Sequence, residues 1–238
     1  MHVGRIMKTD LVTVPMETSL LEAQRILDEK KIAHLLVVDK NEKLIGVVSD
    51  RNLKESWASK ATSLSMHELK YLLDRVTVGM IMVKTLITTS PDTTIERAAQ
   101  ILQQNRISAL PVLENGDLVG IITTNDVLGV ILQAIGINKE STRFSVLVKD
   151  HVGVMAEVTK ILKDQEVNIR SLFTWPEKAY PGVYQLVMRV DAKDGEKAIN
   201  VLTDRGYKVL RDYVKDLSPF LPEAIEKAQG AGHKAQGL

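Results

Sequence analysis

The stretch GIITTND at residues 120–126 holds the side chains best suited to chemistry. Thr123 carries a hydroxyl and Asp126 a carboxylate three positions later, where an apolar strand gives way to a helix. A hydroxyl beside the free N–H groups of a helix N-terminus suits a phosphate, and the carboxylate could accept both hydroxyls of a ribose. Either residue could equally be the N-terminal cap of the helix. Both interpretations remain open from this stretch alone.

A second copy of the phrase, GVVSDRN, occupies residues 46–52 and places Ser49 and Asn52 at the same spacing. The chain aligns with itself at an offset of 75 residues, which becomes 74 after a turn; V-G-x-I-M, for example, occurs at residues 3–7 and again at 78–82. The match covers about 50 residues per copy, which indicates two structurally equivalent units.

Each copy predicts the same order of elements, β-α-β-β-α. A capping box precedes the first helix, so that a hydroxyl and a carboxylate satisfy free backbone N–H groups. Asn115-Gly116 is a strong signal for a hairpin turn, because both residues tolerate positive φ. The predicted positions are strands at 11–14 and 86–89, capping boxes Ser19/Glu22 and Thr93/Glu96, hairpins 35–38/44–49 and 110–113/118–123, and second helices from Asn52 and Asp126. One such unit buries its sheet poorly, so we expect two copies packed face to face with pseudo-twofold symmetry.

The repeated motifs resemble the CBS domain, which is found as tandem pairs called Bateman modules. They are V-G-x-I-M, the A-x-x-I-L helix, the I-S-A-L-P-V strand at 107–112, and Gly followed by two hydrophobic residues and [ST]-x-x-[DN]. The resemblance implies an adenine nucleotide between the repeats, with its phosphate at the hydroxyl, its ribose at the acid and its adenine against two strands. In the second copy these positions are Thr123, Asp126, Ile87, Ile107, Ser108 and Ala109.

The first copy departs from this pattern. Asn52 stands at the acidic position and offers one acceptor oxygen without a charge, while His34 replaces a small alanine and Leu36 a proline. Arg51 could reach a phosphate or be a solvated loop residue. We therefore expect a second, weaker nucleotide site, formed by Ser49, Arg51, Asn52, Val12, Ile32, Ala33 and His34.

Residues 144–210 follow a third pattern, βαββαβ, which predicts an antiparallel sheet with both helices on one face, a ferredoxin-like fold. The stretch D-H-V-G-V-M at 150–155 resembles the first strand-to-helix turn of the ACT domain, a module that senses small metabolites. A glycine there lets the backbone approach a ligand, and the helix N-terminus suits a carboxylate. The resemblance implies an amino-acid site at Asp150, His151, Gly153, Val154 and Asn168; a tight turn that binds nothing is the alternative.

The predicted fold class is therefore α+β, with a tandem CBS pair followed by a ferredoxin-like ACT domain. The predicted boundaries are CBS domain 1 at residues 1–60, a helical linker capped by Ser65 and Glu68 at 61–76, CBS domain 2 at 77–138, the ACT domain at 142–214, and a largely disordered tail at 215–238 with a short helix near 222–228.

Composition narrows the functional classes. The 238 residues include 31 Lys and Arg against 30 Asp and Glu, so no global charge recruits nucleic acid or an anionic membrane. The absence of cysteine excludes disulfides and thiolate metal sites. The most apolar window, residues 127–137, is too short to span a bilayer, and the N-terminus lacks the apolar core of a signal peptide. We expect a cytoplasmic protein.

No catalytic or metal-binding motif stands out, because the five histidines are scattered and no P-loop or G-x-S-x-G is present. We expect no enzyme, no metal and no catalytic cofactor. The module order resembles the bacterial acetoin-utilization regulatory protein family. It implies a homodimeric sensor of an adenine nucleotide (AMP, ADP, ATP, NAD or S-adenosylmethionine) and of an amino acid, which regulates a partner enzyme. The alternative is a scaffold with vestigial pockets; balanced charge disfavours a nucleic-acid regulator.

Overall fold

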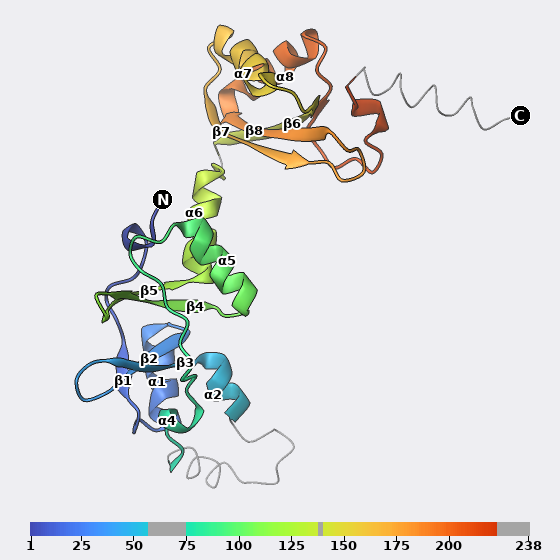
Figure 1. The fold of residues 1–238 in the computed structure, drawn as a ribbon. Helices are drawn as coiled ribbons and strands as arrows, with labels where there is room; N and C mark the ends of the chain where they lie inside the picture. Colours follow the sequence, from blue (N-terminus) through green and yellow to red (C-terminus); the bar gives the residue numbers. More distant parts are fainter. Residues whose placement is uncertain (57–74, 138–139, 223–238) are drawn as a thin grey trace, which may run out of the picture. The chain divides into compact units, whose positions relative to one another are not determined.

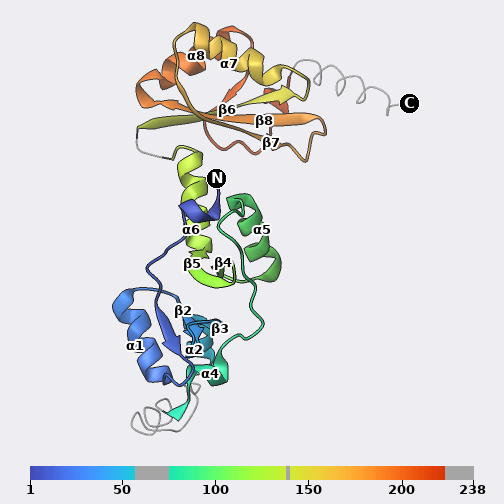
Figure 2. The same ribbon diagram turned by 60° about the vertical axis from the view of Figure 1, so that its left-hand side comes forward.

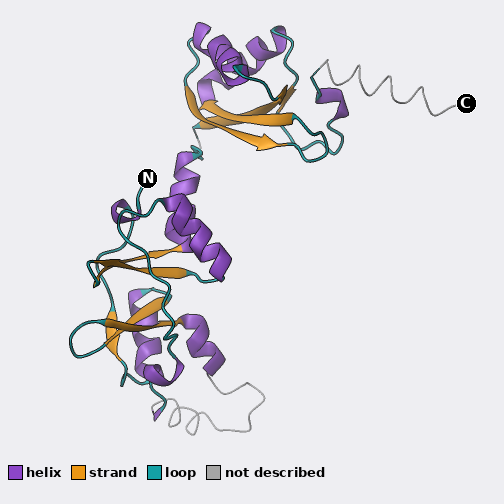
Figure 3. Cartoon of the chain, in the orientation of Figure 1, coloured by secondary structure: helices purple, strands orange, loops and turns teal. Residues whose placement is uncertain are grey.

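The structure is a computed structural model that describes residues 1–56, 75–137 and 140–222 (Figure 1). They fall into two compact units that divide between Gly129 and Val130. Both units contain helices and β-strands, which confirms the α+β class (Figure 3). None of the helices in these ranges has the length and apolar character needed to cross a membrane. The predicted linking helix at Ser65 and Glu68 lies outside the described residues.

The first repeat is a three-stranded sheet with two helices against it. Strand β1 is parallel to β2, and β2 pairs with β3 in an antiparallel hairpin. The apolar stripe of α1, which includes Leu20, Ala23 and Leu27, is buried against the sheet. The elements are β1 (Thr13–Pro15), α1 (Leu20–Lys30), β2 (His34–Val38), β3 (Leu44–Ser49) and α2 (Asp50–Ser56).

The second repeat follows the same order around a two-stranded hairpin. Asn115 and Gly116 have φ angles of 53° and 89°, so the turn between the strands is the one that the sequence predicts. Ile95, Ala98 and Leu102 form the buried stripe of the first helix. The elements are α4 (Val78–Ile81), α5 (Ile95–Asn105), β4 (Ala109–Glu114), β5 (Asp117–Thr123) and α6 (Thr124–Ala134).

Three local predictions are wrong. Residues 86–89 form a single bridge from Thr89 to Val112 rather than a strand. The cap of α5 is Thr94, not Thr93, because the Thr93 hydroxyl accepts a hydrogen bond from the Thr89 hydroxyl at 2.8 Å. The second helices begin at Asp50 and Thr124, two residues earlier than predicted, because the hydroxyl residues that precede them act as the caps.

The two repeats exchange their N-terminal segments. Residues 1–8, including the 3-10 helix η1 (Val3–Arg5), bond to the second repeat, and residues 77–83 bond to the first (Figures 1 and 2). Met7 packs on Gly120 and Met82 packs on Gly46 so closely that a Cβ atom there would lie 2.5 and 2.4 Å from the methionine sulfurs. This packing explains why the sequence repeats a methionine in V-G-x-I-M and a glycine before the strand end.

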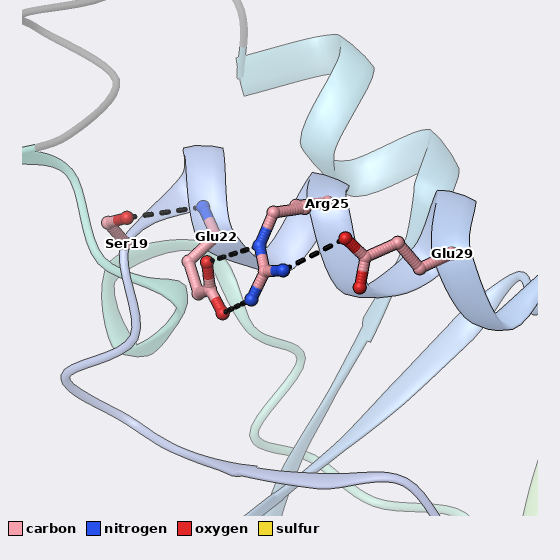
Figure 4. A network of polar contacts seen from close by, with 4 residues as sticks. All are labelled: Ser19, Glu22, Arg25 and Glu29. Atoms are coloured by element: carbon pink, nitrogen blue, oxygen red, sulfur yellow. Dashed lines mark hydrogen bonds and ion pairs between the residues drawn. The ribbon is translucent and has the colours of Figure 1, made fainter.

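The capping box predicted for α1 is only half formed. The Ser19 Oγ accepts a hydrogen bond from the Glu22 N–H at 3.2 Å, but the Glu22 carboxylate accepts from Arg25 (2.6 and 2.8 Å) (Figure 4). Arg25 also donates to Glu29 at 2.8 Å, so one guanidinium links side chains over about two turns of the helix. The hydrogen bond from Arg25 lowers the pKa of Glu22.

The C-terminal unit is an antiparallel four-stranded sheet in the order β7-β8-β6-β9, with both helices packed on one face (Figure 1). Its element order is βαββαβ, which confirms the ferredoxin-like prediction. The core between helices and sheet includes Phe144, Val158, Leu186 and Met188. The elements are β6 (Ser141–Lys149), α7 (Val154–Asp164), β7 (Ile169–Pro176), β8 (Val183–Asp191), the 3-10 helix η2 (Ala192–Asp194), α8 (Gly195–Asp204) and β9 (Val209–Leu210).

The chain beyond β9 is packed as far as Pro222, whereas the sequence predicts disorder from residue 215. Leu221 is fully buried and forms a small second core with Leu147, Val183 and Leu210. The 3-10 helix η3 (Ser218–Phe220) precedes it, and the Tyr180 hydroxyl bonds the Ser218 hydroxyl at 3.0 Å. Residues 223–238, which include most of the predicted tail helix, lie outside the described residues.

Candidate functional site

A cleft of about 700 Å³ lies between the two repeats. The first repeat lines it with residues from the end of α1, from β2 and from the start of α2; the second repeat contributes the equivalent positions. Its apolar walls include Val12, Ile32, Ile87 and Ile107, and the polar groups lie at the strand–helix junctions. Apolar walls with a few convergent polar groups are the usual features of a small-molecule site.

Thr123 and Asp126 form a reciprocal capping box at the start of α6. The Asp126 carboxylate accepts from the N–H and the hydroxyl of Thr123, at 2.8 and 2.6 Å, and the Asp126 N–H donates to the Thr123 hydroxyl at 3.3 Å. The helix-capping role proposed from the sequence is therefore real. A carboxylate has about four lone-pair sites, so this geometry leaves acceptor capacity for a ligand.

Ser49 and Asn52 repeat the same arrangement at the start of α2. The Asn52 Oδ1 accepts from the N–H and hydroxyl of Ser49, at 3.0 and 2.6 Å, and the Asn52 N–H donates back to Ser49 Oγ at 3.2 Å. The amide therefore preserves the cap but contributes no negative charge. The repeated G-x-x-[ST]-x-x-[DN] phrase is thus explained locally as a strand end followed by a capping box.

The segment exchange makes the surroundings of the two caps different. Lys8 pairs with Ile121 of β5, and its Nζ lies 3.5 Å from the free oxygen of Asp126. At the equivalent place in the first repeat, Val83 pairs with Val47 and offers no charge. The Asp126 side chain is 16% exposed and Lys8 is 60% exposed, so this ion pair sits at the edge of the cleft.

Most residues predicted for nucleotide binding line this cleft. In the second repeat, Thr123, Ile87, Ile107, Ser108 and Ala109 do so, whereas Asp126 lies just outside the lining, turned toward Thr123. In the first repeat all seven predicted positions line it: Ser49, Arg51, Asn52, Val12, Ile32, Ala33 and His34. The structure thus brings the two predicted sets together, while their role in binding stays a prediction.

The cleft also contains charged residues that the sequence analysis misses: Lys8, Asp10, Lys31, Asp50 and Arg106. Lys31 and Arg106 were detectable, because they occupy the same repeat position immediately after the first helix. Lys8 had no such signal, because only the segment exchange carries it to the other repeat.

His34 joins the two repeats across the cleft. Its Nε2 lies 2.8 Å from the Ser108 hydroxyl, which comes from the opposite repeat. Burial disfavours the charged form of the His34 imidazole and lowers its pKa below the ordinary value. A second link between the repeats is the ion pair from Lys43 to Asp117 (2.6 Å), which joins the two hairpins.

The residues predicted for an amino-acid site lie around the turn before α7. Gly153 has a φ of 96° and precedes the helix, Asp150 and His151 are exposed, and Val154 is buried in the core. The His151 Nε2 is 3.9 Å from a Glu157 carboxylate oxygen. Asn168 is exposed just before β7. A ligand role for these residues stays a prediction.

A metal centre is not formed by the described part of the chain, where no three His, Asp or Glu side chains gather around a common point. The groups at the cleft are hydroxyls, amides, carboxylates and cations, which can bind an anion and a sugar.

Comparison with protein families divides the chain into three matched segments. The CBS domain model matches residues 3–58 and again 78–133, once in each repeat. The AHAS small subunit-like ACT domain model matches residues 144–204. A homoserine O-acetyltransferase from Methanosalsum zhilinae is 36% identical over 126 residues, 52% of this chain. This chain spans only 23% of the length of that relative.

Several solved structures cover the N-terminal half of the chain. A signal-transduction protein with CBS domains from Burkholderia ambifaria is 22% identical, with a TM-score of 0.51, over 58% of this chain and 99% of that chain, a likeness of fold. An acetoin utilization protein from Vibrio cholerae is 26% identical over 56% and 91% of the two chains, with a TM-score of 0.47. CBSX2, crystallised with AMP, is 33% identical over 56% and 96%, with a TM-score of 0.45.

Proposed function

Because the chain contains a tandem pair of CBS domains followed by an ACT-like domain, we propose that it is a regulatory sensor of an adenine nucleotide. The nucleotide binds in the cleft between the repeats, and the bound state is relayed to a partner enzyme. AMP, ADP, ATP, NAD and S-adenosylmethionine are the candidate ligands. An amino acid at the turn around Asp150 and Gly153 is a second proposed input.

The observation that carries this proposal is the convergence of two capped helix starts on one cleft. Each repeat lines the cleft with a hydroxyl at a strand end, which donates to an amide or carboxylate oxygen three residues later. Between them lie apolar walls, which suit a planar adenine ring. The match of both repeats to the CBS family supports a nucleotide over other ligands. In this proposal the phosphate binds at Thr123 and the ribose at Asp126.

Helix α6 offers a route for the signal. It begins at the Thr123 cap, and its last residues, from Val130 onward, belong to the C-terminal unit. A ligand that forms hydrogen bonds with Thr123 and Asp126 changes the hydrogen bonds that fix the start of this helix. Such a ligand shifts the protein between states only by its difference in affinity for them, commonly about 1–3 kcal/mol.

A homodimer is part of the proposal. Leu128, Ile131 and Leu132 form an apolar row on α6 and are 41–50% exposed. Spacing of three and four residues places them on one face of the helix. Size-exclusion chromatography with light scattering measures the oligomeric state, and a monomer at micromolar concentration would remove this part of the proposal.

Calorimetric titration of AMP and ATP tests the nucleotide site directly. Asp126→Ala should abolish measurable binding, because it removes the proposed ribose ligand. Asn52→Ala is the matched control, since it removes the equivalent cap in the other repeat and should affect binding much less. If no nucleotide of the panel binds the wild-type protein or shifts its melting temperature, a scaffold that acts through its surfaces is the better account.

A further inference from the structure

Three cations of the cleft lining have no carboxylate partner among the residues that the structure describes. Lys31, Arg51 and Arg106 are exposed at its edge, and no ion pair connects them to an acidic side chain within the described ranges of the chain. Lys8 adds a fourth positive charge beside Asp126. The acids of the lining are Asp10 and Asp50, and Asp50 is already paired with Lys54 at 2.5 Å.

Lys31 and Arg106 are equivalent residues of the two repeats. Each is the residue after the first helix, in the left-handed conformation with φ of 52° and 53°, and each backbone N–H closes the last helical turn. Cations are favourable at any helix C-terminus, so this position alone indicates no ligand. The second observation is that both side chains lie on the same cleft, one from each side, with Arg51 nearby in the lining.

We propose that the cleft selects nucleotides with a chain of two or three phosphates over nucleoside monophosphates and over the cationic S-adenosylmethionine. This inference rests on the proposed nucleotide site and specifies its ligand class. The apolar walls hold the base, while the unpaired cations at the edge face a longer, more highly charged phosphate chain. Guanidinium groups suit phosphate oxygens because they donate two parallel hydrogen bonds.

The selectivity can be measured by titrating ATP, ADP, AMP, S-adenosylmethionine and inorganic tripolyphosphate, with EDTA present, at low and high ionic strength. ATP should bind at least about tenfold more tightly than AMP, as expected for one or two charge-assisted hydrogen bonds. S-adenosylmethionine should bind more weakly still. The advantage of ATP over AMP should shrink at high salt, because these cations are exposed.

Variants locate the source of the selectivity. Arg106→Gln and Lys31→Gln should each reduce the ATP-to-AMP ratio by about threefold or more, with AMP affinity little changed. Lys30→Gln and Arg97→Gln are matched controls, because both residues are exposed on the same helices but do not line the cleft. They should leave the ratio at the wild-type value.

The outcomes separate this inference from the proposed function. If AMP or S-adenosylmethionine binds as tightly as ATP, and Arg106→Gln and Lys31→Gln leave the ratio unchanged, the selectivity is wrong while the nucleotide site stands. If tripolyphosphate binds as tightly as ATP, the affinity comes from the cations alone, and the cleft is not a nucleotide site. If nothing binds, the proposed function itself fails.

Discussion

The two halves of the cleft share their backbone and differ in their charges. Both have a hydroxyl cap with a side-chain oxygen three residues later. The half at Thr123 adds the carboxylate of Asp126 and the nearby Lys8, whereas the half at Ser49 has the neutral Asn52 and Val83. On the adjoining strand, the small Ala109 of the second repeat corresponds to the larger His34 of the first.

The difference separates two roles of the repeated phrase: capping the helix, which both halves do, and carrying a negative charge on the capping side chain, which only the Thr123 half does. Asn52 preserves every hydrogen bond of the cap, so helix capping alone does not require an acid at Asp126. The Asp126 carboxylate and its partner Lys8 are therefore not needed for helix capping. We expect the Thr123 half to be the stronger site and the Ser49 half to be the weaker.

Substitution of the packed glycines should have the largest effect. In Gly120→Ala the new Cβ would lie 2.5 Å from the Met7 sulfur and 3.3 Å from the Lys8 carbonyl oxygen, so the exchanged segment must shift. We expect a loss of about 1–3 kcal/mol in the free energy of unfolding, measured with urea, together with weaker nucleotide binding. Gly46→Ala should destabilise similarly, through Met82, but spare the Thr123 half.

Gly129→Ala serves as the control, because no atom lies within 4 Å of the added Cβ and the residue is in α6. It should be neutral or stabilising by about 0.5–1 kcal/mol, as for alanine in a helix. Equal stability of all three variants would contradict the described packing of the exchanged segments.

Exchange of the acid and the amide between the halves should have the next largest effect. Asp126→Asn retains the cap but removes the charge, and should weaken AMP binding by about tenfold. Asn52→Asp should strengthen the Ser49 half enough for a second binding event in calorimetry. Unchanged titration curves for both variants would show that the charge difference has no role in binding.

Removal of Lys8 should have a smaller effect. Because Lys8 is 60% exposed, its ion pair with Asp126 is weak, and Lys8→Gln should reduce nucleotide affinity by roughly threefold. Val83→Gln, at the equivalent place in the other half, should leave affinity unchanged. Surface plasmon resonance at low salt can resolve this difference; a larger loss for Val83→Gln would reverse the ranking of the two halves.

The smallest expected effect is on the pH dependence of stability, to which, among the described residues, only the first half of the cleft contributes a histidine, His34. Burial lowers the folded-state pKa of His34, so the unfolded chain takes up a proton more readily than the folded protein. Stability should therefore fall as pH drops from above the ordinary histidine pKa, about 6.5, toward the lowered value. In His34→Gln the melting temperature, measured by thermal unfolding, should depend less on pH in this window. An unchanged dependence on pH would assign the effect to other groups.

Short-range signals predicted much of the structure. Asn115-Gly116 predicted the hairpin turn. The self-alignment identified Ile107 and Ser108 as site positions of the second repeat, and they line the same cleft as Ala33 and His34. Features that depend on particular side-chain contacts could not be predicted. Thr94 rather than Thr93 caps its helix because a neighbouring hydroxyl holds Thr93.

The same reason applies to the longer-range errors. Lys8 reaches the second repeat only through the exchange of segments, which no local pattern encodes. Leu221 lies in a stretch without periodicity, yet it is buried by contacts with three strands of the C-terminal sheet. Both cases depend on residues that are far apart in the sequence.

A crystal structure of the protein with ATP tests the central claim most directly. It should show the ribose hydroxyls within hydrogen-bond distance of the Asp126 carboxylate and a phosphate at the Thr123 hydroxyl, with adenine between the apolar walls of the cleft. A nucleotide bound elsewhere, with Asp126 still engaged only by Thr123 and Lys8, would contradict the account.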